Sequence, residues 1–235
     1  MAKKNKEISS SNLIKVKPIT DGQKSVFETW KKGQNQFLFG CAGTGKTFIS
    51  LYLAMQDVLD LKTKYDKVIL VRSLIPTREI GFLPGDEEDK AALNQVPYQN
   101  MVKFMFEQPN EQAFNMLYDR LKNQGSLYFL STSFLRGLTF DNSIIIVDEC
   151  QNLNFHELDT ITTRVGQDSK IVFCGDFSQT DLLKQNEKNG LHDFLRILME
   201  MQEFNCIEFN IGDIVRSGFV RNYLIQKTKL GMGME

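Results

Sequence analysis

One motif restricts the fold of this chain more than any other: an eight-residue stretch of the form G-x-x-x-x-G-K-[ST] directly after a short apolar run. It consists of Gly40, Cys41, Ala42, Gly43, Thr44, Gly45, Lys46 and Thr47. Backbone N–H groups in such a glycine-rich turn point at phosphate oxygens, and the next helix adds its positive N-terminal dipole. We therefore expect a strand, this turn and a helix in that order, with a nucleoside triphosphate as the ligand.

Two side chains of the motif have separate expected roles. Lys46 is expected to bridge the β- and γ-phosphates as a point charge, and the Thr47 hydroxyl to occupy one coordination position on Mg²⁺. The alternative is a glycine-rich entry to an ordinary helix. Four fixed positions recur by chance in roughly one chain in a hundred of this length. We therefore favour a site for ATP and Mg²⁺.

Composition argues against several classes of protein. The 235 residues carry a net charge of −1, so any nucleic acid has to be held by a local groove. The four cysteines are widely separated, which argues against a zinc site or a disulfide framework. No apolar run approaches about 18 residues, and the first residues lack the apolar stretch of a signal peptide. We expect a cytoplasmic protein without a membrane segment, in the host cytoplasm if a phage encodes it.

Short apolar segments alternate with helical segments through most of the chain, which predicts an α/β fold with a mainly parallel central sheet flanked by helices. Residues 1–17 are expected to form a flexible basic arm, and residues 18–230 a single domain. Residues 72–126 interrupt the alternation, and this insertion is expected to face the substrate. The expected strands cover residues 36–39, 67–71, 127–130, 143–147, 170–174 and 206–209.

Two carboxylates, Asp148 and Glu149, end the apolar run at residues 143–147. An apolar sheet tolerates such a pair at its carboxyl edge, where ligands bind. Asp148 is expected to hold Mg²⁺ through water, and Glu149 to orient and deprotonate the attacking water. A strand ended by an ordinary acidic turn is the alternative. The phosphate-binding motif about 100 residues upstream favours the catalytic interpretation.

Two glutamines are further candidates. Gln179 follows the strand expected at residues 170–174, and its amide is suited to sensing the γ-phosphate; an ordinary turn is the alternative. Gln23 lies three residues after Thr20, ahead of a helix around residues 24–31. Its role stays open between completing a capping box with Thr20 and reading the polar edges of adenine.

These motifs together resemble the PhoH-like proteins, P-loop ATPases with a RecA-like domain related to the core of superfamily 1 helicases, in the compact form common in phages. The resemblance runs from about residue 20 to residue 227. It departs from the family pattern at Cys41, where proline is usual, at Cys150, where alanine is usual, and at Leu138, where a second arginine is usual. The segments of this chain that carry the resemblance are the phosphate loop, Arg72, and residues 81–86, 134–140, 147–152, 175–181 and 213–216. The resemblance implies an ATPase linked to RNA or single-stranded DNA and assembled as a homo-oligomeric, hexameric ring.

Hydrolysis needs positive charge on the γ-phosphate beyond that of Lys46. By resemblance to a helicase motif, Arg216 is the candidate, and Arg221 is held in reserve. Because the chain has one ATPase lobe, we predict that Arg216 acts on a neighbouring subunit. A surface salt bridge on a C-terminal helix is the alternative for both arginines.

Candidate nucleic-acid contacts are Arg72, Arg136 and Phe82, with Phe134 and Phe140 as further stacking candidates. For each phenylalanine, burial in the core is the alternative.

The sequence predicts a Mg²⁺-dependent ATPase that couples hydrolysis to binding, translocation or unwinding of nucleic acid. Two rivals remain open. One is a nucleotide-gated ring assembly without motor activity, and the other is a phosphotransferase.

Overall fold

The computed structural model describes residues 7–72, 87–132, 135, 137–176 and 190–230, and only the backbone of residues 87–94. Its centre is a six-stranded sheet in the order β3-β2-β4-β5-β1-β6, and every described pair of neighbouring strands is parallel. The strands are β1 (Asn35–Gly40), β2 (Lys67–Arg72), β3 (Leu127–Ser131), β4 (Ser143–Asp148), β5 (Lys170–Gly175) and β6 (Phe204–Phe209). The α/β fold and all six expected strands are confirmed.

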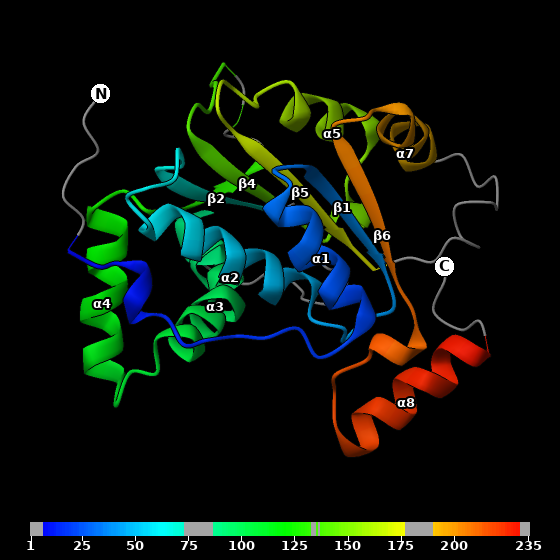
Figure 1. The fold of residues 1–235 in the computed structure, drawn as a ribbon, viewed down its shortest axis with the longest axis horizontal. Coiled ribbons are helices and arrows are strands. Elements are labelled where there is room, and N and C mark those ends of the chain that lie inside the picture. Colours follow the sequence, from blue (N-terminus) through cyan, green and yellow to red (C-terminus); the bar gives the residue numbers. More distant parts are fainter. Residues whose placement is uncertain (1–6, 73–86, 133–134, 136, 177–189, 231–235) are drawn as a thin grey trace.

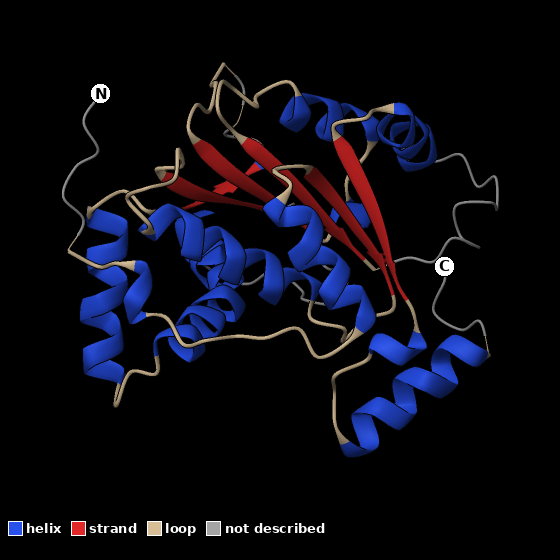
Figure 2. Cartoon of the chain, viewed as in Figure 1, coloured by secondary structure: helices blue, strands red, loops and turns tan. Residues whose placement is uncertain are grey.

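Helices cover both faces of this sheet (Figures 1 and 2). The helices are α1 (Asp21–Lys31), α2 (Lys46–Leu59), α3 (Glu87–Phe106), α4 (Glu111–Asn123), α5 (Phe155–Thr162), α7 (Leu191–Glu200) and α8 (Gly218–Lys229). Short 3-10 turns are η1 (Ser10–Asn12), η3 (Cys150–Asn152) and η4 (Ile211–Asp213).

Successive apolar side chains of the strands point to opposite faces of the sheet and contribute to two hydrophobic cores. In β4, Ile144 and Ile146 pack with α1 to α4, whereas Ile145 and Val147 pack with α5 and α7 on the other face. Successive side chains of a strand point to opposite faces, so a run that is apolar at every position needs cover on both. This burial fixes the register of β4 and therefore places Asp148 and Glu149 at the carboxyl edge of the sheet.

The strand order decides which loops meet at that edge. β5 lies between β1, which leads into the phosphate loop, and β4, which ends in the acidic pair. The residue after β5, Asp176, therefore lies between Lys46 and Glu149. Ligands of open parallel sheets bind at this edge.

The prediction of a flexible arm over residues 1–17 is wrong for residues 7–17. Ile8 and Leu13 are buried in the core that contains α2, α3 and α4. The Ile14 N–H donates to the Met105 carbonyl at 2.8 Å, and the Tyr52 hydroxyl donates to the Ile14 carbonyl at 3.0 Å. The few apolar residues of this stretch show no helical or strand periodicity, although Ile8 and Leu13 pack against helices that are distant in sequence.

The described part of the insertion consists of two helices, α3 and α4, before β3. The break follows α3, where Glu107 has a φ of 44°, and Asn110 caps the next helix by accepting from the Ala113 N–H at 2.8 Å. Val102 and Leu121 are fully buried. This part of the insertion is therefore built into the core.

Among the described residues, none of the helices is both long and apolar enough to cross a lipid bilayer.

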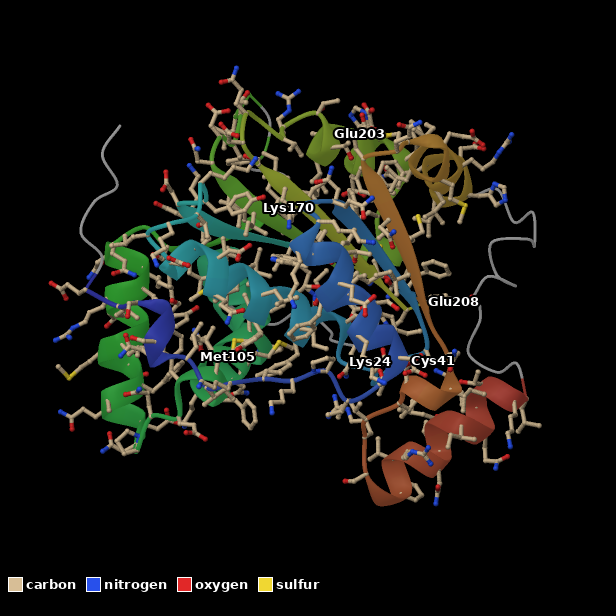
Figure 3. The ribbon with its side chains drawn as sticks, viewed as in Figure 1. Lys24, Cys41, Met105, Lys170, Glu203 and Glu208 are labelled. Carbon is tan, nitrogen blue, oxygen red and sulfur yellow. The ribbon has the colours of Figure 1, made fainter. Side chains whose placement is uncertain are left out.

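Lys170 is an unusual core residue at the opposite, amino end of β5, beneath α1 (Figure 3). Its side chain is 2% exposed; its Nζ donates to the Trp30 carbonyl at 3.2 Å and lies 4.1 Å from the Trp30 ring centroid. Burial lowers the pKa of Lys170 from 10.5 to about 8. The folded state therefore holds a proton less tightly than the unfolded chain does.

We expect Lys170→Met to raise the free energy of unfolding by about 2 kcal/mol at pH 7. The pKa shift corresponds to about 3 kcal/mol, and loss of the hydrogen bond to Trp30 offsets about 1 kcal/mol. Below pH 8 both states bind the proton and the penalty is fully present; between about pH 8 and 10.5 only the unfolded state binds it, so stability rises. The advantage of the variant should therefore shrink across this window.

Urea unfolding at pH 7, 8, 9 and 10 measures this difference, and Lys62→Met is the control because Lys62 is exposed. A difference between Lys170→Met and wild type that does not change with pH would contradict the account.

Candidate nucleotide-binding site

A pocket of about 870 Å³ opens at the carboxyl edge of the sheet. The phosphate loop and the start of α2 form its floor, and the ends of β2, β4 and β5 together with α3 form its walls. Predicted site residues that line it are Gln23, Gly43, Thr44, Gly45, Lys46, Thr47, Arg72, Asp148, Glu149 and Arg216.

Glycine is required where the phosphate loop makes its turn. Gly43 and Gly45 have φ values of 73° and 86°, in the region that favours glycine. A Cβ atom on Gly43 would lie 2.9 Å from Arg216 Cγ and 2.9 Å from Leu224 Cδ1, so the loop is also closely packed. α2 starts directly afterwards at Lys46, which directs its N-terminal dipole into the pocket.

Lys46 lies inside the loop, as its predicted role requires. Its side chain is 5% exposed, and its Nζ donates to the carbonyls of Cys41 at 2.8 Å and Gly40 at 3.2 Å. Nζ also forms an ion pair with Asp176 Oδ1 at 2.7 Å. A bound phosphate would therefore compete with Asp176 for this ammonium group.

Thr47 and Asp148, the two candidate metal-binding residues, lie next to each other. Thr47 Oγ1 donates to Asp148 Oδ1 at 2.6 Å, and Asp148 is 8% exposed. A hydroxyl and a carboxylate are the hard oxygen ligands that Mg²⁺ prefers. No cluster of three His, Cys, Asp or Glu residues that could hold a metal occurs in the described ranges. The Thr47 hydroxyl and the Asp148 carboxylate suit an ion whose remaining ligands would be phosphate and water, which is how Mg²⁺ accompanies ATP.

Glu149 is held in a strained conformation at the end of β4. Its φ of 53° lies in the left-handed region, and Gln151 Nε2 donates to its Oε2 at 2.5 Å. Burial, and then the neighbouring Asp148, raise the pKa of Glu149 above its usual value. A raised pKa makes the carboxylate a stronger base, which suits proton abstraction from water.

Gln151 also connects the two halves of the pocket. Its Oε1 accepts from the Asp176 N–H at 3.1 Å, while its amide nitrogen holds Glu149. Because Asp176 in turn pairs with Lys46, one chain of contacts joins the phosphate-binding lysine to the candidate base.

The two alternatives for Gln23 are resolved in part. Thr20 caps α1 by accepting from the Gln23 N–H at 3.3 Å, but the Gln23 side chain does not return to Thr20. Its Oε1 accepts from the Ile19 N–H at 2.9 Å and its Nε2 donates to the Thr44 carbonyl at 3.1 Å. Gln23 thus holds the phosphate loop through the Thr44 carbonyl, and adenine recognition stays a prediction.

Arg216 lies against the phosphate loop of its own chain. The Val215 N–H donates to the Gly43 carbonyl at 3.0 Å, and Arg216 is part of the same pocket as Lys46. This placement suits a role within one chain, and the action on a neighbouring subunit stays a prediction. Arg221 is exposed on α8 and is not among the residues that line this pocket.

The candidate nucleic-acid residues are not gathered into one surface by the described residues. Arg72 ends β2 beside Asp148 and lines the nucleotide pocket. Phe140 is buried in the core, in line with the alternative for that residue. Phe82, Phe134, Arg136 and Gln179 lie outside the described residues.

Sequence reasoning missed Tyr98 on α3. Its side chain is 2% exposed, and its hydroxyl donates to Asp148 Oδ2 at 2.7 Å. Burial, and then the Asp148 carboxylate, raise the pKa of Tyr98 far above its usual value, so the hydroxyl keeps its proton. Pro97 lies inside α3 beside Tyr98, and no local pattern indicates a contact between residues fifty positions apart.

The phosphate loop, the acidic end of β4 and the parallel strand order define an α/β fold of the P-loop kind. The chain belongs to the PhoH family, since its residues 15–226 match the PhoH-like protein family.

Two relatives support this assignment, and one solved structure supports the fold. The chain is 32% identical over 207 residues to a PhoH-like protein of Synechocystis and 31% identical over 189 residues to protein PhoH of Escherichia coli K12. These matches cover 88% and 80% of the chain, but 60% and 51% of the relatives. The fold is also similar to the large terminase of a thermophilic bacteriophage, with a TM-score of 0.51 at 12% identity, covering 90% of this chain and 50% of the terminase. The chain thus spans about half to three fifths of the length of these proteins.

Proposed function

We propose that the chain hydrolyses ATP with Mg²⁺ and that single-stranded nucleic acid accelerates this turnover. The observation that carries the first part is the convergence of Lys46, Thr47, Asp148 and Glu149 on one pocket. Lys46 would bind phosphate, and Thr47 and Asp148 would hold Mg²⁺, which neutralises developing charge on the phosphates when bound.

Glu149 favours hydrolysis over the phosphotransferase alternative. It lies one residue beyond the metal-binding aspartate, is partly buried, and is oriented by Gln151. A carboxylate held in this way is suited to orient a water and accept its proton. Arg216, in the same pocket, would supply the additional positive charge on the γ-phosphate.

The nucleic-acid part of the proposal is supported by α8. None of its residues is buried, and Phe219 and Tyr223 are 82% and 58% exposed, with their rings stacked at a centroid distance of 6.4 Å. Residues 214–234 contain Arg216, Arg221, Lys227 and Lys229 but no aspartate or glutamate. Exposed aromatic rings beside positive charges favour stacked bases and a phosphate backbone.

Contacts between α8 and the phosphate loop provide a route for stimulation. Leu224 packs near Gly43, and Cys41 Sγ lies 4.0 Å from Thr228 Oγ1 (Cys41 is labelled in Figure 3). A ligand that shifts α8 would therefore act directly on the loop that holds phosphate. Ring assembly remains a proposal that rests on the resemblance to the family. The position of Arg216 in the pocket of its own chain does not add support to it.

The test measures ATP turnover with and without poly(U) or poly(dT), in wild type and in Phe219→Ser/Tyr223→Ser. We expect severalfold stimulation of wild type, an unchanged basal rate in the variant, and at least about tenfold weaker binding of the polymer, since two stacking contacts are lost. The matched control is Met116→Ser/Ile197→Ser, which removes exposed apolar residues of α4 and α7.

Two other results would contradict the proposal. Wild-type turnover indifferent to both polymers would favour the nucleotide-gated assembly, and a phosphorylated acceptor would favour the phosphotransferase.

A further inference from the structure

Tyr98 completes the hydrogen bonding of the candidate metal-binding carboxylate. Thr47, on α2, donates to Asp148 Oδ1, and Tyr98, on α3, donates to Oδ2. The two hydroxyls come from different helices and hold both oxygens of one side chain at 2.6 and 2.7 Å. Asp148 is therefore fixed about the bond that would otherwise allow its carboxylate to rotate.

The position of Tyr98 is itself fixed by packing. Its ring lies 5.6 Å from the Phe129 ring, centroid to centroid, and the residue is 2% exposed. α3 also contributes Pro97, Met101 and Phe104 to the wall of the pocket. Within the described part of α3, Tyr98 thus reaches the candidate metal site through its hydroxyl, and Pro97, Met101 and Phe104 contribute apolar surface.

We propose that Tyr98 is a positioning residue that sets the affinity of the site for the Mg²⁺ complex of ATP over free ATP. This inference rests on the proposed function, since it assigns the metal to Thr47 and Asp148. A group that orients a metal ligand changes metal affinity by about 10–100-fold when it is removed. The hydroxyl of Tyr98 donates to Asp148 and not to the phosphate loop, so the binding of free ATP, whose phosphates would meet that loop, should not depend on the hydroxyl.

The test is Tyr98→Phe, which removes the hydroxyl and keeps the ring that packs on Phe129. Affinity for a fluorescent ATP analogue is measured by titration with Mg²⁺ and with EDTA. We expect the gain in affinity from Mg²⁺ to fall about tenfold in the variant, with the affinity in EDTA unchanged. The Mg²⁺ concentration for half-maximal turnover should rise by a similar factor.

Tyr65→Phe is the matched control, because it removes a buried tyrosine hydroxyl at the amino end of the sheet, away from the pocket. It should leave the Mg²⁺-dependent gain unchanged. Urea midpoints of both variants report whether packing is preserved.

An unchanged Mg²⁺-dependent gain in Tyr98→Phe would overturn the inference. Equal losses of affinity with Mg²⁺ and with EDTA would also overturn it, because they indicate a purely structural role. The binding ratio requires no hydrolysis, so its outcome is distinguishable from failure of the proposed ATPase activity, which the turnover assay reports separately.

Discussion

Glu149→Gln is expected to lower ATP turnover by about 10²–10⁴-fold and to leave ATP binding within about twofold of wild type. The carboxylate is the candidate base, and an amide of the same shape cannot accept the proton of the attacking water. The phosphate contacts belong to the loop and Lys46, which the substitution does not touch. Phosphate release measures the first effect, and equilibrium titration with ATP measures the second.

Glu203→Gln is the control for this substitution, since Glu203 is exposed just before β6 at the amino end of the sheet (Figure 3). It should retain full turnover. A Glu149→Gln protein that hydrolyses ATP at more than a tenth of the wild-type rate would remove Glu149 from the mechanism. Loss of ATP binding would indicate that the variant had damaged the pocket.

Arg216→Ala is expected to lower turnover by about 10³-fold, because a positioned arginine contributes about 10³–10⁵ to phosphoryl transfer. Arg221→Ala, four residues into α8 and outside the pocket lining, should change basal turnover by less than about twofold. Phosphate release under saturating ATP measures both rates.

Mixing Arg216→Ala with Glu149→Gln shows which chain Arg216 serves. If each chain uses its own arginine, every site in the mixture lacks either Arg216 or Glu149, and turnover stays low. We expect this result because residues 215 and 216 contact Gly43 of the same chain. If sites are shared between subunits, some sites in the mixture hold both groups. Recovery of activity would therefore contradict the arrangement within one chain and support the shared sites of a ring.

The sheet and the centre of the pocket were predictable from the sequence because their signals are local. Continuous apolar runs mark strands buried on both faces, and Asp148 and Glu149 end one of these runs. The phosphate loop specifies its own conformation through Gly43 and Gly45. These segments needed no knowledge of distant contacts.

The remaining features depend on which segments meet in three dimensions. Ile8 and Leu13 lie in a mostly polar stretch, and their burial requires helices that start more than thirty residues later. The contact of Tyr98 with Asp148 joins residues fifty positions apart. The position of Arg216 in the pocket depends on how η4 and the residues after it pack against Gly43. No local pattern carries this information.

The central claim is that this pocket hydrolyses ATP, and its most direct test is phosphate release from ATP by the purified chain, with Mg²⁺ and with EDTA. We expect turnover that requires Mg²⁺, increases in proportion to protein concentration and is lost in Lys46→Ala. Phosphate release no greater than that of Lys46→Ala, under conditions in which the wild-type chain binds ATP, would contradict it.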